Sequence, residues 1–114
     1  MGKLRIAVAT NGLDGLKDEV SEVFGRAKTF TIVDAEDGNV TSTRTLTNSA
    51  VSYHHGAGPI AVKMLVDEGV KVVLANELGL GASELLKQHN VTVIPTKPGT
   101  NVEAAIKKAL QTRS

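Results

Sequence analysis

The sequence predicts an α/β domain with a mixed five-strand sheet that is covered by helices. Residues 28–46 carry two short runs in which apolar and polar side chains alternate, and Asp37-Gly38 between them is typical of a hairpin turn. Residues 59–95 then pair a helical pattern with a short apolar run twice, as expected of two right-handed crossovers to parallel strands. At 114 residues the chain fits one domain, which we expect to span residues 1–114.

The first half of the chain is expected to hold three strands. Residues 4–9 form an apolar run that suits a buried strand. The residues that follow it favour a turn: Thr10, Asn11 and Gly12. Residues 13–26 mix acidic, apolar and glycine residues, which predicts a loop with at most a short helical turn. Residues 28–34 and 40–46 are the two strands of the hairpin.

The middle of the chain is expected to pass from a loop through a helix to a fourth strand. Residues 47–57 are polar or small and predict a loop without secondary structure; we expect residues 47–58 to be more mobile than the sheet. Pro59 has the fixed φ that suits the first turn of a helix. Gly69 stands where a left-handed cap would end that helix, and residues 70–75 are the apolar run of a buried parallel strand.

The last part of the chain is expected to add two helices and a fifth strand. Residues 82–88 have inward leucines at helical spacing, and residues 91–95 form the fifth strand. Thr100 and Glu103 have the spacing of a capping box, so the final helix should begin there.

These elements predict the strand order 3-2-1-4-5, with the first, fourth and fifth strands parallel. Those three strands all end at the same edge of the sheet. We call this edge the rim. It contains a topological switch point, the general location of ligands in open α/β sheets. The candidate binding residues at the rim are Thr10, Asn11, Arg26, His54, His55, Gly56, Gly58, Asn76, Gly79 and Gly81.

The composition excludes several classes of function. The chain has no cysteine, so a metal would need nitrogen or oxygen ligands, and cysteine nucleophiles are excluded. With 13 basic and 12 acidic side chains, one tyrosine and two phenylalanines, it has neither the charge nor the stacking surface of a nucleic-acid binder. The apolar run at the start of the chain is too short for a signal peptide, and no membrane span is expected. We therefore expect a cytoplasmic protein.

Catalysis is not expected, and no catalytic residue is assigned. A metal-dependent nuclease needs several carboxylates around its ions, yet residues 4–9 carry no acid and Asp34 should lie at the wrong edge. Glu77 is the one acid expected in a strand-to-helix turn at the rim. Neither Ser52 nor Ser83 has the pattern of a hydrolase nucleophile.

Two stretches resemble the dinitrogenase iron-molybdenum cofactor biosynthesis family: VFGRAKTFTIVD, and HHGAGPIAVKMLVDEGVKVVLANELGLGASELL. The resemblance covers nearly the whole chain. It implies a ribonuclease H-like three-layer domain that binds or carries an iron-sulfur or iron-molybdenum cluster or its precursor. The implied partners are metallocluster donor and acceptor proteins, and the chain is expected to be a monomer or weak dimer. The matching positions are Phe24, Gly25, Arg26, His55, Gly56, Gly58, Gly79, Gly81 and Ala82.

The two histidines of the rim have two interpretations. Adjacent residues of an extended loop point to opposite sides, so His54 and His55 should not ligate one metal together. We favour His55 as an iron ligand through its neutral imidazole. The alternative is that the pair only caps or packs the loop. His89 ends a helix and should lie at the opposite edge, as a charge partner of the helix C-terminus.

The glycines and Arg26 also have a structural interpretation. Backbone amides near Gly56, Gly58, Gly79 and Gly81 would suit an anionic cluster, but glycines beside helices are often turn formers. Arg26 would pair with an anionic ligand, or be a solvated charge at a strand entry. Because helix N-termini bind any anion, a phosphate- or nucleotide-binding regulatory module is the alternative function.

Overall fold

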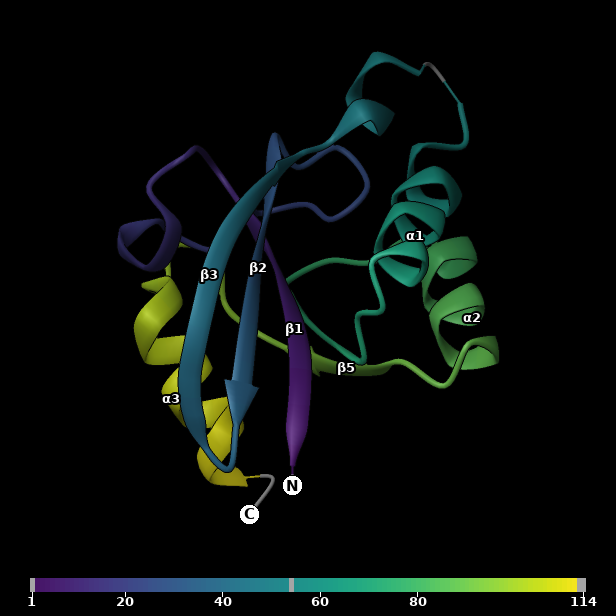
Figure 1. Ribbon diagram of the computed structural model, residues 1–114. Coiled ribbons are helices and arrows are strands. Elements are labelled where there is room, and N and C mark those ends of the chain that lie inside the picture. Colours follow the sequence, from purple (N-terminus) through teal and green to yellow (C-terminus); the bar gives the residue numbers. More distant parts are fainter. Residues whose placement is uncertain (1, 54, 113–114) are drawn as a thin grey trace.

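The computed structural model describes residues 2–53 and 55–112 and consists of a five-strand sheet between helices (Figure 1). The strands are β1 (Lys3–Thr10), β2 (Thr29–Glu36), β3 (Asn39–Thr47), β4 (Val72–Ala75) and β5 (Thr92–Pro95). The α-helices are α1 (Ala57–Asp67), α2 (Leu80–Gln88) and α3 (Val102–Thr112). Two short 3-10 helices are η1 (Gly15–Lys17) and η2 (Ser49–Ser52). Within the described residues, no helix is both long and apolar enough to span a bilayer.

The predicted sheet topology is confirmed. The strand order is β3-β2-β1-β4-β5, β1 pairs in parallel with β4, and β4 pairs in parallel with β5. The hairpin strands β2 and β3 are antiparallel, and β2 is antiparallel to β1. The turn between them uses Asp37 at φ 53° and Gly38 at φ 86°, the left-handed geometry of a type I′ hairpin turn.

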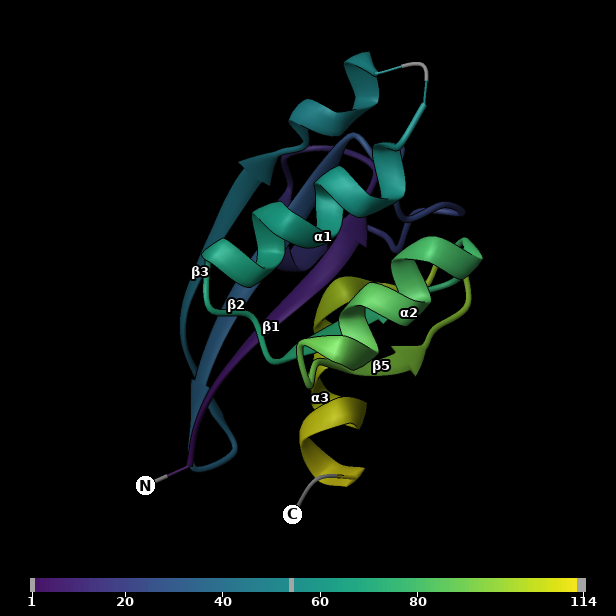
Figure 2. The same cartoon turned by 90° about the vertical axis from the view of Figure 1, so that its right-hand side faces the viewer.

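The alternation of side chains along β1 divides the core into two layers. Ala7 and Ala9 face the side on which α1 and α2 pack, with Phe30 and Leu65. Ile6 and Val8 face α3 on the other side. Figure 1 shows α1 and α2 on one face of the sheet and α3 on the opposite face, and Figure 2 shows α1 and α2 lying side by side.

The C-terminal end of α1 follows the prediction. Gly69 has φ 80°, its N–H donates to the carbonyl of Val66, and the N–H of Val70 donates to the carbonyl of Leu65. This is the Schellman pattern of a glycine cap. Because Val70 is used to close the helix, β4 begins at Val72, two residues later than expected.

Pro59 lies in the first turn of α1, as expected, and Gly56 at φ 75° is the N-cap of that helix. Two other sequence expectations need correction. The capping box of Thr100 and Glu103 is not the cap of α3: the Oδ1 of Asn101 accepts the N–H of Ala104 at 3.0 Å instead. The loop of residues 47–57 is not free of secondary structure, since it contains η2. Its higher mobility stays a prediction.

The short helical turn expected within residues 13–26 is present as η1, and a buried carboxylate organises the loop around it. Asp18 is 6% exposed. Its oxygens accept the N–H groups of Gly12 at 3.0 Å, Asp14 at 3.1 Å and Glu19 at 2.7 Å. One side chain therefore holds much of the chain that leaves β1.

Opposite the rim, Arg5 joins the sheet to the end of α1. Its guanidinium donates to Asp34 Oδ1 at 2.7 Å and to the carbonyl of Glu68 at 2.6 Å. Ser42 Oγ also donates to Asp34 Oδ2 at 2.8 Å. The hydrogen bond from Arg5 holds the pKa of Asp34 below its ordinary value.

We expect Asp34→Asn to lower the free energy of unfolding more at neutral pH than near pH 2. A depressed carboxyl pKa contributes stability above the unfolded value of about 3.9, and that contribution is lost as the pH falls through the lower folded value. The effect should be modest, because the Arg5 and Asp34 side chains are 38% and 27% exposed. Urea unfolding of both proteins at the two pH values tests this, and an equal difference at both would contradict it.

Candidate functional site

The rim is assembled from loops that are far apart in the sequence. Val23 forms a parallel bridge with Glu77, just after the end of β4. The Nδ2 of Asn76 donates to the carbonyl of Glu22 at 3.0 Å. The candidate residue Asn76 therefore fastens the loop after β1 to the end of β4, and its side chain has a structural partner.

The three sequence motifs of the rim meet at their glycines. A β-carbon on Gly25 would lie 2.8 Å from both the Cα and the N of Gly58. A β-carbon on Gly58 would in turn lie 3.3 Å from that of Ala82. The first motif therefore packs against the second, and the second against the third. For Gly25 this close approach of two backbones explains why glycine is needed.

The remaining glycines leave more room. No described atom lies within 4 Å of the position of a β-carbon on Gly56 or Gly79. A β-carbon on Gly81 would lie 3.9 Å from the ring of Pro59, which is ordinary contact. The surface at Gly56 and Gly79 is thus open to a ligand, whereas the contact between Gly25 and Gly58 is closed.

The N-termini of α1 and α2 lie against each other at this place. Gly56 and Gly79 are their N-caps, and glycine has no side chain to accept the first amides. Neither helix, each wholly within the described chain, has an acidic residue in its first turn. Pro59 lacks an N–H, so α1 offers fewer amides than α2. The positive ends of two helix dipoles therefore face one patch of surface, where they favour an anion.

The charged and polar candidates differ in exposure. His55, Arg26 and Asn11 are exposed, and Arg26 directly follows Gly25 at the closed contact. The hydroxyl of Thr10 is fully buried, 2.7 Å from Thr29 Oγ1 and 3.1 Å from Thr31 Oγ1, so it packs strand ends instead of facing the rim surface. His54 lies outside the described residues.

The described side chains do not form a site with three or more ligands for a metal ion. Within residues 2–53 and 55–112, no three histidine, aspartate or glutamate side chains are grouped closely enough to hold a metal ion. His89 is the C-cap of α2 and lies at the opposite end of that helix from Gly79. Of the described histidines, His55 is the one that directly precedes an open glycine, Gly56.

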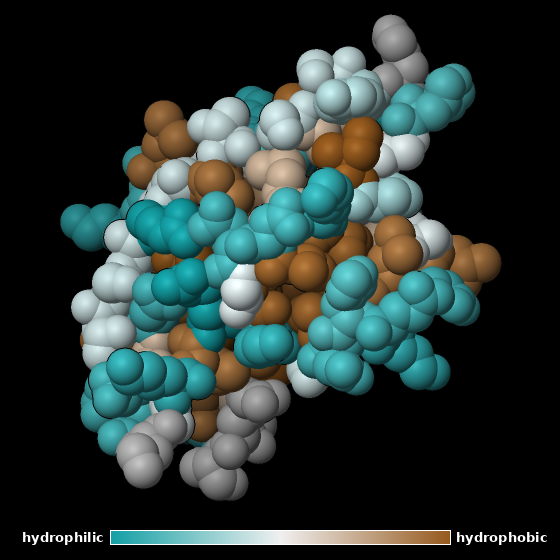
Figure 3. Space-filling model, turned by 45° about the vertical axis from the view of Figure 1, so that its right-hand side comes forward, coloured by the Kyte–Doolittle hydropathy of each residue, from teal (hydrophilic) through white to brown (hydrophobic). Residues whose placement is uncertain are grey.

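Sequence reasoning missed the apolar side chains of the rim. Leu80, next to Gly79, is 81% exposed, and Val23 and Tyr53 are 41% and 50% exposed. Figure 3 shows apolar surface on the face that carries α1 and α2, between groups of hydrophilic side chains. A leucine at the first position of a helix was the signal in the sequence. One sequence does not show, however, whether such a leucine is exposed.

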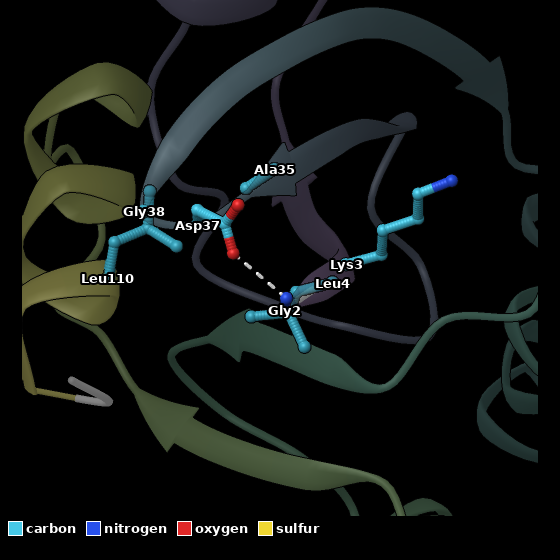
Figure 4. A pocket seen from close by; sticks show the side chains of 7 residues that line it. All are labelled: Gly2, Lys3, Leu4, Ala35, Asp37, Gly38 and Leu110. Carbon is cyan, nitrogen blue, oxygen red and sulfur yellow. Dashed lines mark hydrogen bonds between the residues drawn. The ribbon is translucent and has the colours of Figure 1, made fainter.

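A cavity of about 370 Å³ lies away from the rim, at the hairpin end of the sheet (Figure 4). Its lining is mostly small or apolar: Gly2, Lys3, Leu4, Ala35, Asp37, Gly38 and Leu110. The N–H of Gly2 donates to Asp37 Oδ1 at 2.9 Å across it. None of the candidate residues contributes to this cavity.

Comparison with known proteins shows the family to which the chain belongs. Residues 2–112 match the model of the family described as dinitrogenase iron-molybdenum cofactor. The chain belongs to this family. The resemblance seen in the sequence is thereby confirmed, and family membership points to a role in metallocluster assembly or binding.

Two solved structures share the fold, and a further protein shares sequence. The apo form of the orange protein from Desulfovibrio gigas is 31% identical, with a TM-score of 0.87 over 96% of this chain and 88% of that one. A protein from Thermotoga named as a candidate NifB protein is 37% identical, with a TM-score of 0.75 over 96% and 90%. An uncharacterised protein of Methanocaldococcus jannaschii is 27% identical over 82% of this chain and 79% of its own.

Proposed function

We propose that this family member is a non-catalytic carrier that binds an iron-sulfur or iron-molybdenum cluster, or a precursor of one, at the rim and passes it between a donor and an acceptor protein. The observation that carries the proposal is the pair of helix N-termini at Gly56 and Gly79, which lie side by side without an acidic residue in either first turn. Such a surface favours an anionic cargo over a bare metal cation.

The charge of the rim fits a cluster that brings its own sulfide ligands. Each helix N-terminus acts as about half a positive elementary charge, and Arg26 stands in the segment that packs on Gly58. Metallosulfur clusters with thiolate ligands are anions whose sulfurs accept hydrogen bonds. Main-chain amides at the start of α2 are suitable donors to those sulfurs.

His55 is the residue that we assign to direct ligation of iron. It is exposed, and it precedes the open N-cap Gly56. A neutral imidazole nitrogen is a suitable ligand for iron. It would take the place of one small thiolate of the cluster, which would leave to solvent as the free thiol. Because the chain has no cysteine, this coordinate bond would be the main bond between protein and iron. Binding should therefore be reversible, as transfer to an acceptor protein requires.

An anaerobic titration with a synthetic iron-sulfur cluster carrying small thiolate ligands tests this function. The protein should take up the brown cluster and its melting temperature should rise, because a ligand that binds the native state stabilises it.

The alternative regulatory module gives a different result in the same assay. A melting temperature raised by nucleotide or inorganic phosphate, with no uptake of the cluster, would replace the carrier function with a phosphate-binding one.

A further inference from the structure

Asn48 is a fully buried polar residue between β3 and η2, and its side chain makes three hydrogen bonds to the main chain. Its Nδ2 donates to the carbonyl of Gly25 at 3.0 Å and to that of Ala27 at 2.8 Å. Its Oδ1 accepts the N–H of Ala50 at 3.0 Å. The backbone N–H of Asn48 adds a bond to the carbonyl of Lys28 at 3.1 Å.

These bonds join the segment that carries Arg26 to η2, which precedes His55 along the chain. The carbonyls of Gly25 and Ala27 flank Arg26, so the amide group of Asn48 grips the chain on both sides of that cation. Ala50 belongs to η2, from which the chain runs on to His55 and Gly56. Asn48 therefore ties the Arg26 segment to η2, the 3-10 helix that leads toward His55.

The chemistry of this position requires asparagine. Its side chain is short and offers two N–H donors and one carbonyl acceptor, which match two carbonyls and one N–H. Aspartate would present oxygen to both carbonyls, and serine has one hydroxyl. A buried amide with every partner in place rigidifies the loops it joins.

We propose that Asn48 is a positioning residue of the rim, which sets its affinity for an anionic cluster by holding Arg26 and the approach to His55 in one arrangement, without touching the ligand. The cluster-binding part rests on the proposed function; the positioning of the two segments does not. Loss of an outer residue that orients ligand-binding groups typically weakens binding by about tenfold to a hundredfold.

The test compares Asn48→Ser with Thr31→Val. Serine still offers an oxygen to the N–H of Ala50 but cannot donate to both carbonyls. Because serine is smaller than asparagine and also polar, the domain should stay folded. Thr31→Val is the matched control, because it also removes a fully buried hydrogen-bonding group, here the hydroxyl beside Thr10. Two quantities are measured below the melting temperature of each variant: affinity for the synthetic iron-sulfur cluster, and exchange of the Ala27 amide, which donates to Phe24 at 3.2 Å.

Asn48→Ser should weaken cluster binding by about tenfold or more and speed exchange at Ala27, while Thr31→Val loses thermal stability but keeps wild-type affinity and exchange there. Wild-type affinity in Asn48→Ser, or an equal loss in Thr31→Val, would overturn the positioning role. If the wild-type protein binds no cluster, the proposed function fails, and the exchange at Ala27 alone decides: unchanged exchange in Asn48→Ser would overturn the inference.

Discussion

Gly25→Ala should destabilise the domain by about 3 kcal/mol, at the upper end of the usual range for overpacking. The added β-carbon would lie 2.8 Å from two backbone atoms of Gly58 and 3.2 Å from the carbonyl carbon of Ala57. Backbone atoms at the start of α1 cannot move aside as a flexible side chain would. The first motif must therefore separate from the second, and the rim would lose its geometry together with the stability.

Gly79→Ala is the matched control for this substitution. No described atom lies within 4 Å of its β-carbon position, and its φ of −62° with ψ of 159° is accessible to alanine. The change in the free energy of unfolding should stay within about 0.5 kcal/mol. Chemical denaturation of the three proteins measures both values. A Gly25→Ala protein as stable as Gly79→Ala would show that the close contact of the two motifs does not exist in solution.

His55→Ala should lower the affinity for an iron-sulfur cluster at least about tenfold, or ~1.4 kcal/mol, because it removes the one imidazole that we assign to iron. His89→Ala should leave the affinity unchanged, since that residue caps the far end of α2. Both side chains are exposed, so neither substitution should unfold the domain.

The measurement is an anaerobic titration followed by visible absorbance, with circular dichroism to verify folding. Equal uptake by His55→Ala and the wild-type protein would remove the histidine from the mechanism. The paired helix N-termini would then be the whole of the binding surface. Loss of uptake in His89→Ala as well would contradict the assignment, because His89 lies at the far end of α2.

The sheet could be predicted because its signals are local. The Asp37-Gly38 turn and the alternation on each side of it determine the hairpin, and two helix-strand repeats determine the parallel strands. The end of α1 was also local, since Gly69 supplies a conformation that other residues adopt only at a cost. For these elements, the periodicity of the side chains and the turn residues agree.

The start of α3 was mispredicted by one residue because a contact distant in sequence decides it. The carbonyl of Thr100 accepts the N–H of Val20 at 2.9 Å, and Asn101 forms a bridge with Glu19. These pairings hold Thr100 outside the helix and leave Asn101 as the cap. Both residues are good caps in isolation, so their sequence alone does not discriminate between them.

The sheet topology predicted where the candidate site lies, but not the contacts that hold its loops together. Strand order brought the motifs to the rim, whereas the contact of Gly25 with Gly58 joins residues that no local pattern relates. The same holds for Asn48, whose partners Gly25 and Ala27 lie 23 and 21 residues away along the chain. Periodicity also cannot show that the Thr10 hydroxyl turns into the core, since threonine suits either environment.

The most direct test of cluster binding at the rim is nuclear magnetic resonance of the amide-labelled protein during addition of a paramagnetic iron-sulfur cluster under anaerobic conditions. We predict that resonances of residues 55–58 and 79–82 broaden first, while those of the hairpin turn at Asp37 and Gly38, at the opposite end of the sheet, stay sharp. Broadening that begins at the hairpin, or uniform broadening over the chain, would contradict a site at the N-termini of α1 and α2.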